Sequence, residues 1–408
     1  MSPEIRYDLQ IKFGSEYGEE ERTAMLDVLA KGAPTSGDAC VAFEKAFAEY
    51  CGTRHARCVS NGTAALFLSM VALDIRPGDR IITTPLTWIA TAASAAVLGA
   101  EIDFVDIDSR TYNLNPENIE AKVTPQTKAI VPVHMYGQCC DMDPILAIAD
   151  KYGLAVVEDA CHAVGGEYGG RKAGSLGTTG CFSFHEQKNM STLGEGGMVV
   201  TDDPDLFERI ALYRSHCTRV YGKSTKYCSL DEDKFPMGKR FWFQDFDDCG
   251  YNFRITEIQA AVGLVQLKKL DALNHRRIDN AAYLTRGLAD IPGLTVPHVA
   301  DENKHVFHLY PVLIDPEVFG VDKDDFVHEM WHKHGVKVGT HYIPLHWTTA
   351  FRKRGYAKGM FPVADTVGER VVTLPINPRQ ERKALDHLVD SVCSVYRGQS
   401  PRRTADGN

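Results

Sequence analysis

The chain has 408 residues, of which 44% are hydrophobic and 24% charged, and its formal net charge is -9. This is the composition of a globular protein of two or three domains, and the acidic balance argues against a nucleic-acid partner held by general electrostatics. No apolar run reaches transmembrane length, the amino terminus lacks a signal-peptide pattern and the eleven cysteines show no metal-ligand spacing, so we expect a cytoplasmic protein with free thiols, no membrane segment and no metal site.

The first half of the chain alternates predicted helices with predicted strands. Helices are expected over residues 18–30, 39–50, 116–122 and 144–152, and an apolar helix after the turn at residues 60–63. Strands are expected over residues 56–59, 80–84, 101–107, 128–134 and 154–158. Alternation at this spacing is typical of βαβ units. It predicts an α/β fold with a mostly parallel central sheet and helices on both faces.

The second half begins with strands at 180–185 and 198–201 and a helix at 205–215. Residues 216–248 mix basic and aromatic side chains with little periodicity, so they form either a loop that covers a ligand or contacts a subunit, or a plain surface insertion. The remaining predicted elements are helices at 256–273, 276–288, 323–334 and 382–397 and strands at 306–314 and 336–341. The expected division is a large domain over 1–275, a smaller α+β domain over 276–398 and a disordered tail over 399–408.

A carboxylate and a lysine stand next to two of these strands. Asp159 ends the apolar strand 154–158, and Lys188 follows the strand 180–185. The carboxyl ends of parallel strands face the ligand crevice of an open sheet. This pair suits pyridoxal phosphate (PLP), with Lys188 forming a Schiff base to the aldehyde and Asp159 keeping the ring nitrogen protonated. The alternatives are an Asp159 that forms a turn or caps a helix and a Lys188 that is solvated at the surface.

A candidate phosphate site lies upstream, where a short strand breaks at Ser60-Asn61-Gly62-Thr63 and an apolar helix begins. The free N–H groups and the positive dipole end of a helix attract a phosphate. The alternative is ordinary helix capping by Ser60 or Thr63. Trp88, which heads the next helix, is placed either to stack on a planar ring or in the core.

The chain resembles the DegT/DnrJ/EryC1/StrS aminotransferase family from about Phe13 to Pro378. Six motifs carry the resemblance, in order along the chain: Ser60-Asn61-Gly62-Thr63-Ala64-Ala65-Leu66, Glu158-Asp159-Ala160-Cys161-His162-Ala163, Ser183-Phe184-His185 with Lys188, Gly194-Glu195-Gly196-Gly197, Gly250-Tyr251-Asn252-Phe253-Arg254 and His341-Tyr342-Ile343-Pro344-Leu345-His346.

This resemblance implies a fold-type-I PLP-dependent transferase that works as a homodimer with shared active sites. It would move an amino group from L-glutamate or L-glutamine to a keto sugar or keto-cyclitol in antibiotic or polysaccharide biosynthesis. The residues that match the family's cofactor site are Lys188 for the Schiff base, Asp159 under the ring nitrogen, His162 beside the ring hydroxyl, Trp88 on the ring, Ser60, Gly62, Thr63 and Ser183 at the phosphate, and Asn252 reaching the phosphate of the partner subunit.

Two kinds of acceptor remain open. A nucleotide-linked sugar needs cations for its diphosphate, and the candidates are Lys223, Lys226, Lys239, Arg240 and Arg254. A free cyclitol such as scyllo-inosose needs only groups that bind hydroxyls, for which the candidates are His341, Tyr342 and His346. The alternative is that none of these residues binds a substrate: the lysines and arginines are solvated, and His341 and His346 are packed loop residues.

Other reactions are weighed against transamination. Sugar dehydratases of the same family carry histidine in place of the lysine, so Lys188 argues against that reaction, and the intact cofactor motifs argue against a non-catalytic binding protein. The chain departs from many relatives at Thr178, where they have Asp, and at Cys217, where Gly is expected. Both departures are expected near the acceptor side, and they leave the substrate open.

Overall fold

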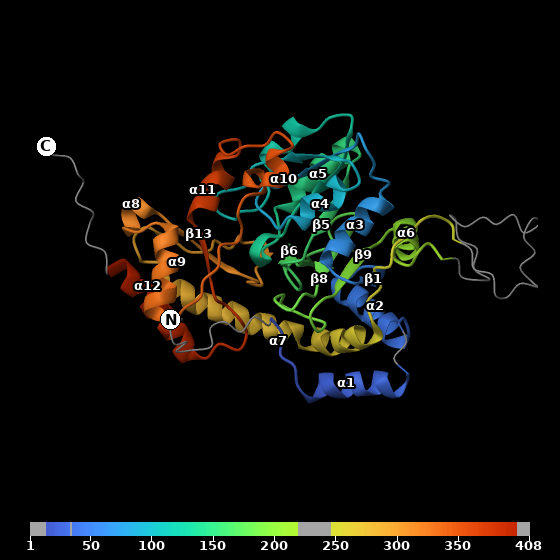
Figure 1. Cartoon of the computed structure of the whole chain (residues 1–408), viewed down its shortest axis with the longest axis horizontal. Coiled ribbons are helices and arrows are strands. Elements are labelled where there is room, and N and C mark those ends of the chain that lie inside the picture. Colours follow the sequence, from blue (N-terminus) through green and yellow to red (C-terminus); the bar gives the residue numbers. More distant parts are fainter. Residues whose placement is uncertain (1–13, 33–34, 219–245, 398–408) are drawn as a thin grey trace, which may run out of the picture.

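The computed structural model describes residues 14–32, 35–218 and 246–397 (Figure 1). Its centre is a seven-stranded sheet in the order β1-β9-β8-β5-β4-β2-β3. Five strands from β8 to β3 pair in parallel, and β9 runs antiparallel to both of its neighbours. The predicted α/β fold with a mostly parallel sheet is therefore confirmed. The strands are β1 (His55–Val59), β2 (Arg80–Thr83), β3 (Glu101–Phe104), β4 (Thr127–Val131), β5 (Ala155–Asp159), β8 (Thr179–Ser183) and β9 (Gly197–Thr201).

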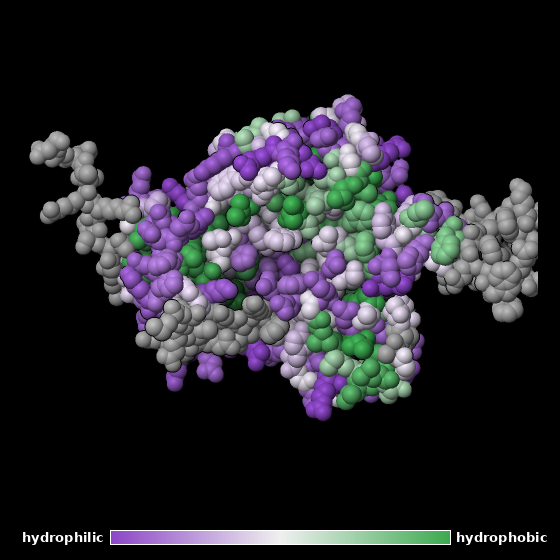
Figure 2. Space-filling view, viewed as in Figure 1, coloured by the Kyte–Doolittle hydropathy of each residue, from purple (hydrophilic) through white to green (hydrophobic). Residues whose placement is uncertain are grey.

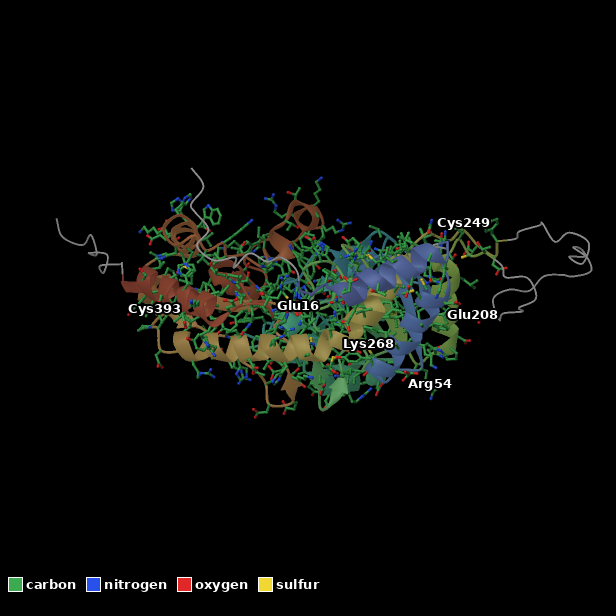
Figure 3. The ribbon with its side chains drawn as sticks, turned by 90° about the horizontal axis from the view of Figure 1, so that it is seen from below. Glu16, Arg54, Glu208, Cys249, Lys268 and Cys393 are labelled. Atoms are coloured by element: carbon green, nitrogen blue, oxygen red, sulfur yellow. The ribbon has the colours of Figure 1, made fainter. Side chains whose placement is uncertain are left out.

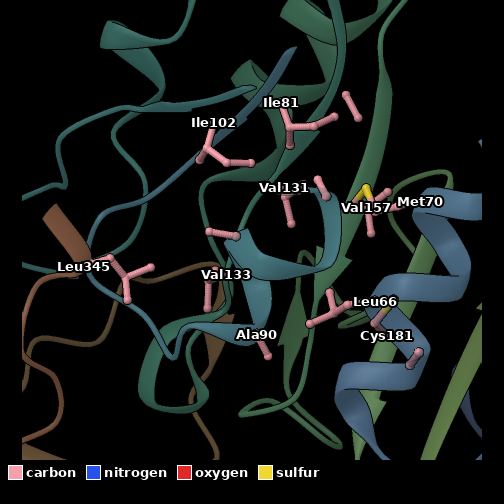
Figure 4. Packing of buried hydrophobic residues seen from close by; sticks show 14 of the residues in the cluster. Leu66, Met70, Ile81, Ala90, Ile102, Val131, Val133, Val157, Cys181 and Leu345 are labelled. Atoms are coloured by element: carbon pink, nitrogen blue, oxygen red, sulfur yellow. The ribbon is translucent and has the colours of Figure 1, made fainter. Parts of the chain in front are cut away.

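Hydrophobic cores cover both faces of this sheet, because successive strand residues point to opposite sides. Val131 and Val157 belong to the core under α3 and α4, where Leu66 and Met70 of α3 meet them (Figure 4). Ile130, one residue before Val131, belongs to the opposite core under α2 and α5. The helices of this part are α1 (Glu19–Ala30), α2 (Asp38–Cys51), α3 (Gly62–Ala72), α4 (Ala90–Ala96), α5 (Met142–Tyr152) and α6 (Pro204–Arg214).

The predicted helices at 256–273 and 276–288 form one helix, α7 (Glu257–Leu288). Its start is fixed by a capping box in which Thr256 and Gln259 exchange hydrogen bonds. Leu273 and Asn274, at the expected break, are buried, and Asn274 Nδ2 donates to the Val164 carbonyl at 2.9 Å. Packing therefore carries the helix across this position. Seen from below, α7 runs unbroken from Lys268 toward the end of the molecule that holds Cys393 of α12 (Figure 3).

A third core joins the second half of α7 to the C-terminal part of the chain. An antiparallel sheet in the order β10-β12-β13 lies at its centre, and a small sheet β11-β6-β7 forms separately. The strands are β6 (Glu167–Tyr168), β7 (Arg171–Lys172), β10 (Leu294–Thr295), β11 (Asn303–Lys304), β12 (Tyr310–Ile314) and β13 (Val371–Leu374). The helices are α8 (Pro316–Phe319), α9 (Lys323–His334), α10 (Thr349–Arg352), α11 (Pro362–Arg370) and α12 (Arg382–Arg397).

Two predicted elements are wrong. The helix expected over 116–122 is a pair of short 3₁₀ turns, Pro116–Asn118 and Glu120–Lys122, because only Ile119 of this stretch is buried and little packing supports a longer helix. The strand expected over 336–341 is reduced to one bridge between Gly339 and Thr373. Apart from this bridge, β13 pairs only with β12 among the described residues, and residues 337–342 line a cavity instead.

The expected domain boundary at residue 275 falls inside α7, and the division into a large and a small domain stays a proposal. The expected disordered tail lies outside the described residues. Within the described ranges, no helix has the length and apolar character needed to cross a membrane.

Candidate active site

Two neighbouring parallel strands, β5 and β8, bring polar residues to one edge of the sheet, at Asp159 and Ser183. The Asp159 carboxylate is buried; it accepts a hydrogen bond from Thr91 Oγ1 at 2.7 Å and one from the Cys161 N–H at 3.2 Å. The second contact is a turn, so the alternative role expected for Asp159 is present. Asp159 also lines a large cavity, where its negative charge is held in a fixed orientation.

Glu158, the residue before Asp159, anchors the end of β5 from behind. Its carboxylate accepts hydrogen bonds from the N–H groups of Gly174, Leu176 and Gly177 at 2.6–2.8 Å and pairs with His134 Nε2 at 2.7 Å. His134 Nδ1 accepts from the backbone of the protein, so Nε2 carries the proton and donates. This network fixes the strand end that presents Asp159.

Lys188 lies in the loop between β8 and β9 and lines the same cavity. Its Nζ lies 3.5 Å from His308 Nε2. Burial lowers the pKa of Lys188, and the charges of Cys161, Asp159 and Glu195 partly oppose that shift. A lysine whose pKa is lowered is more often neutral, and it can then act as a nucleophile or a base. The surface alternative for Lys188 is therefore wrong.

The first turn of α3 faces Ser183 across the cavity wall. Asn61 caps this helix, since its Oδ1 accepts from the Ala64 N–H at 2.8 Å, so the expected capping by Ser60 or Thr63 is wrong. The N–H groups of Gly62 and Thr63 lie in the first turn of α3, where the helix offers them no acceptor, and both residues line the cavity. These N–H groups and the helix dipole provide a site for a phosphate.

Gly62 permits this arrangement because of its missing side chain. A Cβ at Gly62 would lie 2.8 Å from Ser183 Cβ and 2.9 Å from Cys161 Sγ. These contacts are shorter than real Cβ atoms tolerate, so the first turn of α3 reaches the ends of β5 and β8 only with glycine at this position.

The cavity has a volume of about 1230 Å³ and is lined by the large sheet, α3, α4 and the C-terminal part. One side of the cavity holds His162, whose ring lies 4.6 Å from that of His308 and 5.8 Å from that of Tyr342. The Tyr342 hydroxyl is 3.1 Å from His162 Nε2, and His162 Nδ1 has no partner among the described residues. Burial, followed by the nearby Lys188 and His341 charges, holds the pKa of His162 well below its usual value, so His162 is neutral.

Trp88 and His341 complete the part of the predicted site that lines the cavity. The Trp88 side chain is 61% exposed, which argues against its alternative role in the core, and its ring centroid lies 6.1 Å from that of Tyr342. His341 Nδ1 is 2.6 Å from Thr373 Oγ1, a contact that orients the ring.

Several predicted site residues are not among the cavity-lining residues. Ser60 donates its N–H to the Phe253 carbonyl, and exposed Asn252 forms a bridge with Ser215. His346 is fully buried and its Nε2 lies 2.7 Å from Asp365 Oδ1, so it has no surface for a substrate and fits the packed alternative. Lys239 and Arg240 lie outside the described residues.

The two departures from the family pattern also have positions in the structure. Thr178 Oγ1 accepts from the Val156 N–H at 3.0 Å, at the start of β8 and outside the cavity lining, so the expectation that it lies near the acceptor is wrong. Cys217 is buried beside α6, where its N–H donates to the Leu212 carbonyl at 2.8 Å.

Three residues of the site were missed from the sequence. His308 and Arg277 line the cavity, and Thr91 holds Asp159. His308 stands next to Leu309-Tyr310 at the start of a buried strand, and Thr91 lies one turn after Trp88 in an alanine-rich stretch. For His308 the available signal was a polar residue just before a strand. Arg277 and Thr91 lie on helices, and their place in the site depends on contacts between distant segments.

The cavity residues fit PLP. A helix N-terminus suits the phosphate, a fixed carboxylate suits the basic ring nitrogen, and a lysine of lowered pKa suits the aldehyde. The close approach at Gly62 and the free Nδ1 of His162 are two further features that a polar ligand in this cavity would explain.

Comparison with known proteins agrees with this geometry. The model of the DegT/DnrJ/EryC1/StrS aminotransferase family matches residues 15–393. The chain is 38% identical to GDP-perosamine synthase of Caulobacter vibrioides, over 87% of this chain and 89% of that protein.

Two solved structures are similar over nearly the whole chain. DesV of S. venezuelae, solved in complex with a ketimine intermediate, is 34% identical with a TM-score of 0.82, covering 93% of this chain and 94% of DesV. The PLP form of the putative sugar aminotransferase Spr1654 of Streptococcus pneumoniae is 25% identical with a TM-score of 0.84, covering 95% and 98%.

Proposed function

We propose that this chain, which belongs to the DegT/DnrJ/EryC1/StrS aminotransferase family, transfers an amino group from L-glutamate or L-glutamine to a keto sugar. It is a PLP-dependent aminotransferase. The observation that carries the proposal is the meeting of three groups in one cavity: a half-buried lysine of lowered pKa, a fixed carboxylate and the first turn of a helix.

Each of these groups has a defined task. When bound, PLP supplies an aldehyde that condenses with amines and a ring that withdraws electrons from the carbon losing its proton. Gly62, Thr63 and Ser183 would hold the phosphate, and Asp159 would pair with the ring nitrogen. Lys188 attaches the cofactor and then moves the proton at the donor Cα, for which its neutral form is required. Neutral His162 would lie beside the ring hydroxyl.

A nucleotide-linked keto sugar is the acceptor that we favour. The similar protein of Caulobacter vibrioides is named GDP-perosamine synthase, and a cavity of about 1230 Å³ exceeds the usual range for small ligands, roughly 300–1,000 Å³. Exposed Lys337 lines this cavity and offers a cation for a diphosphate. A keto-cyclitol such as scyllo-inosose is the alternative, with His341 and Tyr342 as the groups that bind its hydroxyls.

An absorbance spectrum tests the proposal. L-glutamate or L-glutamine, added without an acceptor, should convert the visible band of the bound cofactor into the near-ultraviolet band of its aminated form. A keto sugar should then restore the visible band. Absence of a cofactor band after adding PLP would contradict the cofactor assignment. A band that responds to no amino donor would contradict transamination and favour a dehydratase, and recovery by keto-cyclitols alone would contradict the sugar.

We also propose a homodimer with shared active sites, in a reducing cytoplasm. Figure 2 shows hydrophobic surface gathering over α3 and α4, next to the cavity. Exposed apolar side chains there include Trp88, Ile89 and Val97, and an exposed apolar patch of this kind favours a protein contact. The free cysteines found in the described residues agree with a reducing compartment.

Asn252 is the residue that tests the shared site. It is exposed on its own subunit and does not line its own cavity, as expected for a residue that serves the partner. Asn252→Ala should weaken PLP retention by about tenfold, the loss of one hydrogen bond to a phosphate. Equilibrium dialysis of PLP measures this, with Asn118→Ala, on a distant 3₁₀ turn, as the control. Equal retention in both variants would remove the shared-site proposal.

A further inference from the structure

Arg277 is a buried cation with no carboxylate partner in the part of the chain that the structure describes. It lies on α7, is 2% exposed and lines the cavity. Its Nη1 donates to the carbonyl oxygens of Phe307 at 3.3 Å and Ile376 at 3.2 Å. Neighbouring Arg276, in contrast, is exposed and pairs with Glu16 at 2.9 Å. Two successive arginines of one helix therefore differ: Arg276 has a carboxylate partner at the surface, and Arg277 is buried without one.

The hydrogen bonds of Arg277 leave one edge of its guanidinium open. Nε is buried without a partner, and Nη2 makes no hydrogen bond to the described residues. Nε and Nη2 form the edge on which arginine binds a carboxylate with two parallel hydrogen bonds. The Cβ position at Gly14 lies 3.0 Å from Nη2, so the backbone of Gly14 borders this edge.

An uncompensated charge in the interior is costly, because the carbonyl dipoles replace only part of the lost hydration. Burial lowers the pKa of Arg277 to about 9, which leaves the side chain charged at neutral pH. A cavity-lining cation with a free edge is stabilised when a ligand brings an anion. The energetics therefore point to an anionic ligand rather than to a purely structural arginine.

The position of Arg277 near Lys188 indicates which anionic substrate it binds. The Cβ position at Gly14 is 1.6 Å from the Lys188 carbonyl oxygen as well as 3.0 Å from Arg277 Nη2, so the guanidinium lies beside the backbone of Lys188. Arg277 also holds the carbonyl of Phe307, the residue before His308, whose Nε2 is 3.5 Å from Lys188 Nζ. In a keto sugar the carbon next to the reacting carbonyl carries hydroxyls, whereas an amino-acid donor has a carboxylate next to its amine.

We propose that Arg277 binds a carboxylate of the amino donor through its Nε–Nη2 edge. This deepens the proposed aminotransferase function and rests on it. The acceptor, whose anionic groups are at least a sugar ring away from the reacting carbon, does not use Arg277. Arg277 therefore sets affinity for the donor and for the keto acid formed from it, and leaves affinity for the acceptor unchanged.

Arg277→Gln tests this assignment, with Arg276→Gln as the matched control that removes the same charge from the next residue. The half-saturating L-glutamate concentration for the spectral change should rise roughly 100-fold in Arg277→Gln, the effect of losing a charge-assisted pair. Half-saturation by the keto acceptor should change less than about threefold, and Arg276→Gln should match the wild type in both. If L-glutamine weakens as much as L-glutamate, the α-carboxylate is the bound group; if only L-glutamate weakens, it is the side-chain carboxylate.

An unchanged donor half-saturation in folded, PLP-loaded Arg277→Gln would overturn the proposal, as would equal losses for donor and acceptor. If no amino donor converts the cofactor of the wild-type protein to its aminated form, that result would instead contradict the proposed function. Calorimetric titration of the wild type keeps the test independent of the folding of the variant. Glutarate, a dicarboxylate without an amine, should bind at least about 30-fold more tightly than its neutral diamide. Equal binding of the two compounds would also overturn the proposal.

Discussion

Lys188→Ala should lower the rate of amino transfer by at least about 10³-fold, since in the function we propose one side chain serves both as the attachment point of the cofactor and as the proton carrier. No other described lysine is placed to replace it: Lys337 lines the cavity but is exposed, whereas Lys188 is half-buried near Asp159 and has a lowered pKa. The phosphate site and Asp159 do not depend on the Lys188 side chain, so the variant should still bind PLP noncovalently.

Borohydride reduction followed by peptide mass spectrometry measures the attachment. The wild type and the control Lys337→Ala should each carry the reduced cofactor on Lys188, and Lys188→Ala should carry none. A small free amine such as methylamine, added to Lys188→Ala, should restore part of the rate, because it supplies the missing base. A reduced adduct on another lysine, or a variant that turns over at the wild-type rate, would refute the role of Lys188.

Local pattern was sufficient for much of the fold. The alternation of apolar strands with amphipathic helices predicted the parallel sheet, and the helices 323–334 and 382–397 match α9 and α12. Local pattern was insufficient where contacts between distant segments decide the secondary structure. Two separate helical stretches were predicted around Asn274, but this residue is buried and hydrogen-bonded to Val164 within one continuous α7. Strand 336–341 has the right residues, yet only Gly339 finds a partner, because pairing depends on where β13 lies.

The site divides in the same way. Asp159, Lys188 and the turn at Gly62 stand at the ends of predicted elements, so sequence could place them at one edge of the sheet. His308 and Arg277 come from the C-terminal part and from α7, 120 and 89 positions after Lys188, and nothing in the local sequence connects them to it. His346 shows the reverse: its motif suggested the substrate, but Asp365 pairs with it in the interior.

Asp159→Asn should slow the donor half-reaction by about 10²- to 10³-fold, which corresponds to roughly 3–4 kcal/mol of lost stabilisation. Asparagine keeps the size of the side chain; its oxygen can still accept from the Cys161 N–H, and its NH₂ group can donate to Thr91 Oγ1 where the carboxylate accepted from it. The substitution therefore removes the negative charge with little change in shape. In the site we propose, that charge would keep the cofactor's ring nitrogen protonated and the ring electron-withdrawing, so the loss should appear in the rate constant more than in donor half-saturation.

Two controls separate charge from packing at this position. Thr91→Val removes the 2.7 Å hydrogen bond to Asp159 but keeps the carboxylate, and should cost less than about tenfold in rate. A cofactor analogue methylated on the ring nitrogen is permanently positive and needs no carboxylate to stay so; it should raise the rate of Asp159→Asn but not that of the wild type. If the analogue leaves Asp159→Asn unchanged, or if Thr91→Val is as slow as Asp159→Asn, the carboxylate acts by holding the turn at Cys161 and not through its charge on the ring.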